Sequence, residues 1–138
     1  MAKVIVSPSL GLGAMLALAA AKDKDVEELT VLRAQYMTLQ DHFEELEDSL
    51  TGDDDEDDSI HAEIKSVGTR QRDIYNRMLH TVYPKVLKLR RDLYTDLEAM
   101  GGEKAPRARA LVEKIADIDL LLSRDPFHDA QFKRVTVR

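Results

Sequence analysis

The feature that most constrains the fold of this 138-residue chain is a heptad pattern of large apolar residues in its first half. The pattern consists of Leu29, Leu32, Tyr36, Leu39, Phe43, Leu46 and Leu50. Alternating spacings of three and four place all of them on one face of an α-helix, as in helices that pack against a second helix. Asp25 and Glu28 have the spacing of a capping box, which predicts that this helix begins near residue 26. We expect it to end near residue 50.

A second, longer amphipathic segment follows a run of six acidic residues at positions 53–58. Its apolar positions are Ile60, Ile64, Val67, Ile74, Met78, Val82, Val86, Leu89, Leu93, Leu97 and Met100. Asp58 or Ser59 is a suitable N-cap, so we predict a helix over residues 59–100. Pro84 lies inside the pattern and predicts a kink just after Tyr83, because proline removes an internal hydrogen bond. Gln71 occupies one apolar position, where a polar group can fix the register of two paired helices.

The short connection between these two helices predicts an antiparallel hairpin. Gly101 and Gly102 end the second helix, and a third is expected over residues 106–124, with Pro106 in its first turn. Short strands are predicted at both ends of the chain, over residues 3–6 and 134–138. The predicted fold class is therefore all-α, in one domain of residues 1–138. Residues 1–21 form an N-terminal arm and residues 125–138 a strand-like tail.

Charge is unevenly distributed along the chain. Residues 22–63 contain sixteen acidic and three basic residues, whereas residues 64–91 contain eight basic residues and one acidic residue. This pattern favours two helices that neutralise each other's charge. Nucleic-acid binding is not expected, because the net charge is −6 and phosphate binding needs a basic surface. The chain has no cysteine, which excludes disulfides and thiolate ligands.

The apolar stretch over residues 4–25 allows more than one interpretation. Gly11 and Gly13 resemble the start of a dinucleotide-binding turn, but Met15 and Leu16 stand where a small residue is needed, and no second parallel strand follows. A secretory signal peptide is a second interpretation, since Lys3 precedes twelve apolar residues and an alanine-rich cleavage site. Twelve residues are too few to span a membrane. The third interpretation is a helical arm that packs on its own hairpin or on another chain.

We predict no catalytic, cofactor-binding or metal-binding residues. The acidic run fails as a calcium loop, because Asp58 and Ile64 stand where an EF-hand needs glycine and glutamate. The four histidines are expected to be surface residues, and no serine lies in a nucleophile motif. They are His42, His61, His80 and His128.

These features favour a non-enzymatic structural or assembly subunit of a multi-subunit complex, for which a virus or phage particle is one hypothetical setting. Its neighbours would be further copies of the chain or other protein subunits, in the cytoplasm or in an assembled particle. The predicted interface residues are Val4, Ile5, Val6, Leu12, Leu16, Val135 and Val137. Free strand edges at the termini can add to a sheet of a neighbour. Two alternatives stay open: a small soluble adaptor or inhibitor of one protein, and an exported helical protein whose first 21 residues are removed.

Overall fold

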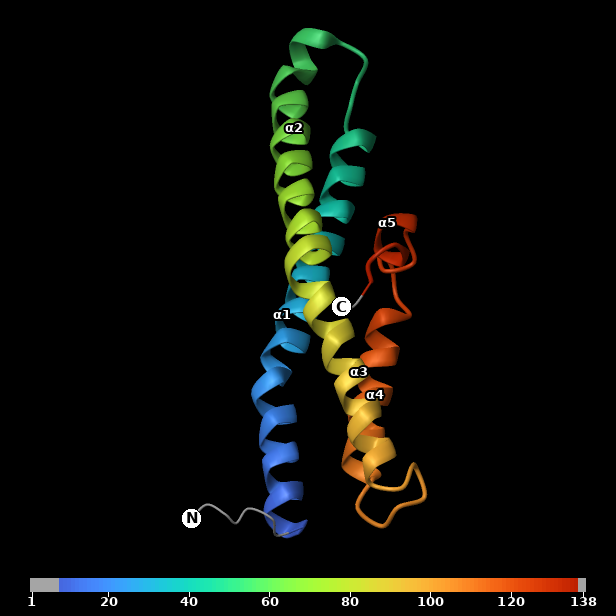
Figure 1. The fold of residues 1–138 in the computed structure, drawn as a ribbon. Helices are drawn as coiled ribbons and strands as arrows, with labels where there is room; N and C mark the ends of the chain where they lie inside the picture. The colour runs from blue at the N-terminus through green and yellow to red at the C-terminus, as the bar shows by residue number, and fades with distance from the viewer. Residues whose placement is uncertain (1–7, 137–138) are drawn as a thin grey trace.

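The protein is a long helical hairpin with a shorter helix packed beside one end (Figure 1). The computed structural model describes the backbone of residues 8–136 and the side chains of residues 24–136. The elements are α1 (Pro8–Asp48), α2 (Asp54–Arg77), the π-helical turn η1 (Met78–Val82), α3 (Tyr83–Ala99), α4 (Arg109–Leu122) and α5 (Ala130–Lys133). Helix α2, η1 and α3 run on as one long helix, against which α1 and α4 pack. The predicted all-α fold with an antiparallel hairpin is confirmed.

Helix α1 begins much earlier than the capping box predicts. It runs without interruption from Pro8, so Asp25 lies inside the helix and does not cap it. The physical reason is the alanine- and leucine-rich stretch at residues 14–21, which favours helix strongly and contains no residue that would end it. Proline is also well suited to the first helical position. The expected separate arm is therefore continuous with the heptad helix from Pro8 on, and the strand expected at residues 3–6 lies outside the described residues.

The upper half of the hairpin is held by a small apolar core. Leu39 and Leu46 of α1 pack with Val67 of α2, and Phe43 packs against the same cluster. Next to it, the side-chain amide of Gln71 donates a hydrogen bond of 2.6 Å to the Gln40 side chain. This polar contact crosses the hairpin at the position where a polar residue interrupts the apolar pattern of α2, and it is consistent with the predicted role of Gln71 in fixing the register.

Pro84 is accommodated by the π-helical turn that precedes it. In η1 the Tyr83 amide donates a hydrogen bond to the Met78 carbonyl, five residues earlier in the chain. Proline has no amide hydrogen, and in an α-helix its ring would collide with the carbonyl four residues earlier, that of His80. A turn with one extra residue avoids that collision, and Pro84 then lies at the start of α3. The disturbance expected at Pro84 thus takes the form of a wider turn, and the long helix continues.

The larger core lies where α1, η1, α3 and α4 meet. Leu29, Met78 and Val82 are completely buried there, and α4 contributes Leu111 and Ile118. Helix α4 begins at Arg109, later than the predicted residue 106, because Gly101 and Gly102 adopt positive φ angles and open a loop after α3. The apolar spacing of the third helix nevertheless correctly predicts which face it buries.

The described part of the predicted C-terminal strand, residues 134–136, is not in a strand. These residues have no strand pairing, and α5 forms a short helical turn just before them. Phe132 and Phe127 are buried, and both rings contact Tyr83, at centroid distances of 4.8 and 5.5 Å. The turn that buries these two rings brings Val135 against the larger core of its own chain, and this packing overrides the alternation of valine with polar residues.

A cluster of tyrosines and phenylalanines joins this segment to the hairpin. Tyr36 of α1, Tyr75 of α2 and Phe132 of α5 contact one another in sequence, with centroid distances of 5.7 and 5.2 Å. The Tyr75 hydroxyl donates a hydrogen bond of 3.0 Å to Asp129. Burial, followed by this hydrogen bond, raises the pKa of Tyr75 to about 12, and burial also raises the pKa of Tyr36 and Tyr83. The tyrosines therefore stay neutral in the core.

Candidate protein-interaction surface

Most of the predicted interface residues cannot be placed in contacts. Val4, Ile5, Val6 and Val137 lie outside the described residues. Leu12 and Leu16 belong to α1, but their side chains lie outside the described part. Val135 is half-buried and packs against the larger core of its own chain. Val135 is the one residue of the seven whose side-chain contacts are described, and part of its surface is buried against its own chain.

The histidines do not form a metal site. Among residues 24–136 no three histidine, aspartate or glutamate side chains are grouped so that they could hold a metal ion. His61 and His80 are exposed, and the His128 Nε2 bonds the backbone carbonyl of Ser123. These positions agree with the prediction of surface histidines.

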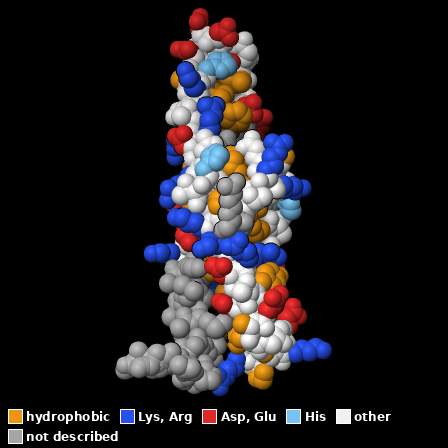
Figure 2. Space-filling model, viewed as in Figure 1, with side chains coloured by type: hydrophobic (Ala, Val, Ile, Leu, Met, Phe, Trp, Pro, Cys, Tyr) orange, Lys and Arg blue, Asp and Glu red, His pale blue; other side chains and the backbone are white. Residues whose placement is uncertain are grey.

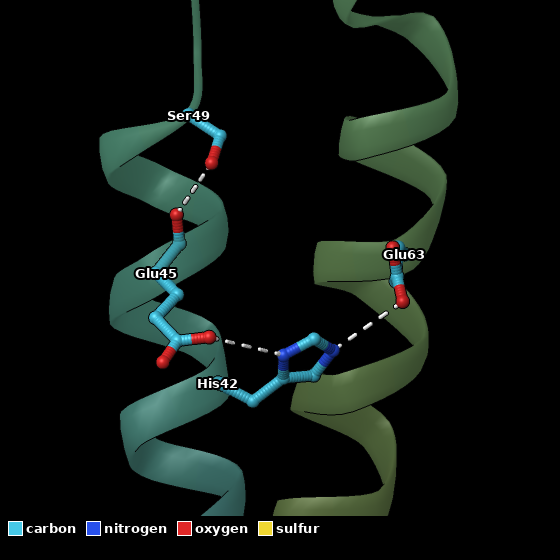
Figure 3. A network of polar contacts seen from close by, with 4 residues as sticks. All are labelled: His42, Glu45, Ser49 and Glu63. Carbon is cyan, nitrogen blue, oxygen red and sulfur yellow. Dashed lines mark hydrogen bonds and ion pairs between the residues drawn. The ribbon is translucent and has the colours of Figure 1, made fainter.

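His42 makes a polar bridge between the two arms of the hairpin (Figure 3). Its Nε2 lies 3.3 Å from Glu63 on α2, and its Nδ1 lies 4.0 Å from Glu45 on α1. The Ser49 hydroxyl nearby donates to the backbone carbonyl of Glu45 and not to the imidazole. The described contacts therefore pair His42 with carboxylates, and they give Ser49 no histidine to activate it as a nucleophile.

The tip of the hairpin is ordered by Asp57, one of the six acidic residues at positions 53–58. Helix α2 starts at Asp54, earlier than predicted, because Asp53 caps it and acidic side chains are favourable in a first turn. Asp57 is only 2% exposed. Its carboxylate accepts hydrogen bonds of 2.9–3.0 Å from the amides of Thr51 and Gly52 and from the Thr51 hydroxyl. Gly52 has a φ of 91°, a value that suits glycine at this turn.

We predict that Asp57→Asn lowers the melting temperature at pH 7 by several degrees. The hydrogen bond that the backbone amide of Thr51 donates to Asp57 holds the pKa of this carboxyl below its ordinary value of 3.8. A carboxyl with a lowered folded-state pKa stabilises the fold above its unfolded pKa, and this contribution is lost as the pH falls through the folded pKa. The difference in melting temperature between wild type and variant should therefore shrink as the pH falls below 3.8. Asp58→Asn, at the exposed neighbouring position, is the control. Equal melting temperatures for wild type and Asp57→Asn at pH 7 would contradict the assignment.

The tip of the hairpin is strongly acidic. Residues 41–63, which form the tip from both arms, contain twelve acidic residues and no lysine or arginine. Figure 2 shows acidic side chains covering this end, with most basic side chains on the visible face nearer the middle of the molecule. The predicted neutralisation between the helices is limited in the described part to a few contacts, such as the ion pair between Arg77 and Glu28. The acidic tip is thus largely uncompensated.

A shallow groove runs along the exposed side of α1, and we call it the α1 groove. Its lining includes Val31, Ala34, Gln35 and Thr38 of α1 and Arg70 of α2. A second hollow continues from it past Val31 toward Lys24 and Glu27. Val31, which lines both hollows, is 54% exposed. The side chain of Arg33 donates a hydrogen bond to the Asp125 carbonyl, so its side of α1 faces the C-terminal segment. Gln35, which lines the groove, lies roughly 200° around the helix from Arg33, so the groove faces away from that segment.

The α1 groove was not predicted from the sequence. Its signal was present, because Val31, Ala34 and Thr38 repeat the three- and four-residue spacing of the apolar seam on another side of the same helix. These residues are smaller or more polar than those of the apolar seam, so hydrophobic periodicity alone does not single them out.

No described helix is both long and apolar enough to cross a membrane. The comparisons with known proteins give no family: no protein-family model matches the sequence, and neither a curated protein nor a solved structure matches it.

Proposed function

We propose that this protein is a non-enzymatic assembly subunit that contacts neighbouring protein subunits through its N-terminal arm and its helical hairpin. The observation that carries the proposal is the α1 groove. It leaves Val31 54% exposed along one side of the longest helix, while the other side of that helix is buried in two cores. A groove along an exposed helix face, lined by Val31 and Ala34, gives a neighbouring helix a place to pack.

The shape of the molecule supports the same function. Helix α1 has 41 residues and lies along a partner helix of similar length, so the hairpin exposes a large surface for the size of its core (Figure 1). An elongated hairpin gains stability from neighbours that bind its folded form. The arm residues Leu12 and Leu16 belong to this same helix, which continues unbroken into the hairpin.

A second candidate is a small adaptor or inhibitor that binds one basic protein. The observation that favours it is the tip, where twelve acidic residues in positions 41–63 face no lysine or arginine within the same range. A surface with a single sign of charge accelerates association with an oppositely charged partner. Such an adaptor would be a monomer in the absence of that partner.

Light scattering on the purified full-length chain and on a Leu12→Gln/Leu16→Gln variant tests the proposal. Glutamine keeps the helix propensity of leucine, so circular dichroism should be unchanged. We expect the wild type to form oligomers whose mass falls in the variant, because apolar contacts of the arm are lost. A Leu120→Gln variant, altered at an exposed residue of α4, is the control. A wild type that is monomeric at every concentration would contradict self-assembly and favour the adaptor. Oligomers of unchanged mass in the variant would show that Leu12 and Leu16 of the arm do not mediate the contacts between subunits.

A further inference from the structure

The exposed side of α1 carries a regular row of residues, which we call the outer row. It consists of Lys24, Glu27, Val31, Ala34, Thr38 and Asp41. Every member is exposed, and the spacings alternate between three and four, as in the buried seam of the same helix. The outer row therefore lies along a single exposed face of the helix. It lies along the α1 groove, and no described helix covers it.

The outer row is complementary to itself when it is read in reverse. If a second α1 lies antiparallel with its centre between residues 32 and 33, Lys24 meets Asp41 of the second copy. Glu27 then meets Thr38 of the second copy, and Val31 meets Ala34 of the second copy. A two-fold axis repeats each contact, so small apolar residues lie at the centre and opposite charges at both ends.

A residue outside α1 strengthens this complementarity. Arg70 of α2 lines the α1 groove next to Thr38. In the antiparallel arrangement the Glu27 of the second copy faces Thr38 and so lies beside this guanidinium. Among the described residues, Lys24, Glu27, Asp41 and Arg70 form no ion pair within their own chain. Their charges are thus available to a partner.

We propose that the outer row of α1 pairs with the outer row of a second copy of this chain in an antiparallel helix pair. This inference rests on the proposed function as an assembly subunit and names the partner of one face. The paired region, residues 24–41, spans about 25 Å of helix. The antiparallel direction places the two acidic tips at opposite ends of the pair. A parallel pair would bring both tips together, with twelve acidic residues each, and like charges would oppose it.

A charge-exchange cycle on the full-length chain tests the pairing, with sedimentation equilibrium at low salt as the measurement. Lys24→Asp places two aspartates opposite each other at both ends of the pair, so we expect the dimer Kd to rise about tenfold. Asp41→Lys should have the same effect through opposed lysines. The double variant Lys24→Asp/Asp41→Lys restores opposite charges, and its Kd should return to within about threefold of the wild-type value. All four substituted positions in the pair are exposed, so circular dichroism should not change.

Two further variants separate this pairing from other contacts. Val31→Asp should weaken the dimer at its centre, whereas Leu120→Asp, at a similarly exposed apolar residue of α4, should leave the Kd unchanged. A wild type that stays monomeric at up to about 1 mM would overturn the pairing, as would single variants without effect or a double variant that is not rescued. The Leu12→Gln/Leu16→Gln variant keeps the outer row intact. If oligomers respond to that variant but not to the charge cycle, the assembly function stands and the self-pairing of the outer row fails.

Discussion

Phe132→Ala is expected to destabilise the protein by about 3–5 kcal/mol, as is usual when a buried aromatic side chain is removed from a core. Phe132 is 1% exposed, and its ring contacts those of Tyr75, Tyr83 and Phe127. Its removal leaves a cavity between α5 and the long helix, so the C-terminal segment loses the ring contacts that hold it against Tyr75 and Tyr83. Urea denaturation followed by circular dichroism measures the loss as a lower midpoint.

Gln131→Ala is the matched control, because the side chain next to Phe132 is exposed. It should change the free energy of unfolding by less than about 0.5 kcal/mol. If Phe132→Ala also changed stability by no more than this control, the C-terminal segment would not be docked as described. Near-ultraviolet circular dichroism gives an independent reading, since the tyrosines of the cluster would lose their fixed surroundings.

The second large effect is expected for Leu29→Ala, at about 3 kcal/mol. Leu29 is completely buried, and it packs in the larger core with Met78 and Val82 of the π-helical turn. It is the residue of α1 that is buried deepest in that core, so the cavity would loosen the contact between α1 and the rest of the molecule. Thermal unfolding should show a melting temperature lower by roughly 10 °C.

Val31→Ala provides the comparison on the same helix, two residues away. Val31 is 54% exposed, so its truncation should alter the stability of the monomer by less than about 0.5 kcal/mol. Equal losses from the two substitutions would show that the inner and outer faces of α1 are assigned wrongly. Dilute samples are needed, because self-pairing through the outer row would add to the apparent stability.

The helical hairpin could be predicted from the sequence because its signal is local and repeated. Leu39, Phe43 and Leu46 recur at helical spacing, and the short link after Leu50 leaves few ways to bury them. The partner residues in α2 follow from the same spacing, which is why Phe43 packs near Val67 as the antiparallel pairing predicts. Charge added little to this prediction, since both arms of the tip are acidic.

Helix ends and the tail could not be predicted in the same way. Asp25 has the chemistry of a cap, but a cap acts only where a helix stops, and the alanine-rich stretch before it continues the helix. Nothing in the sequence distinguishes Asp57 from the acidic residues around it. Its role depends on the turn, which places the amides of Thr51 and Gly52 against its carboxylate. The valines of the tail alternate like a strand, yet the burial of Phe132 decides the conformation. The failures at Asp57 and in the tail reflect tertiary contacts that override a local preference, whereas the failure at Asp25 reflects the helix propensity of the residues before it.

The π-helical turn determines how this chain would respond to a change in its length. Each residue advances an α-helix by about 100°, so in a regular α-helix Val86 would lie about 120° around the axis from Ile74. The wider π-helical turn takes up one extra residue and keeps the apolar stripe of α3 in phase with that of α2. Ile74, Met78, Val82 and Val86 accordingly follow one another in steps of four, where strict alternation would include a three. Loss of one residue within positions 78–82 would give a regular α-helix with the stripe still in phase, but Pro84 would then lie inside it, where its ring collides with the carbonyl four residues earlier. The same loss in the loop at residues 101–108 would leave both stripes in phase.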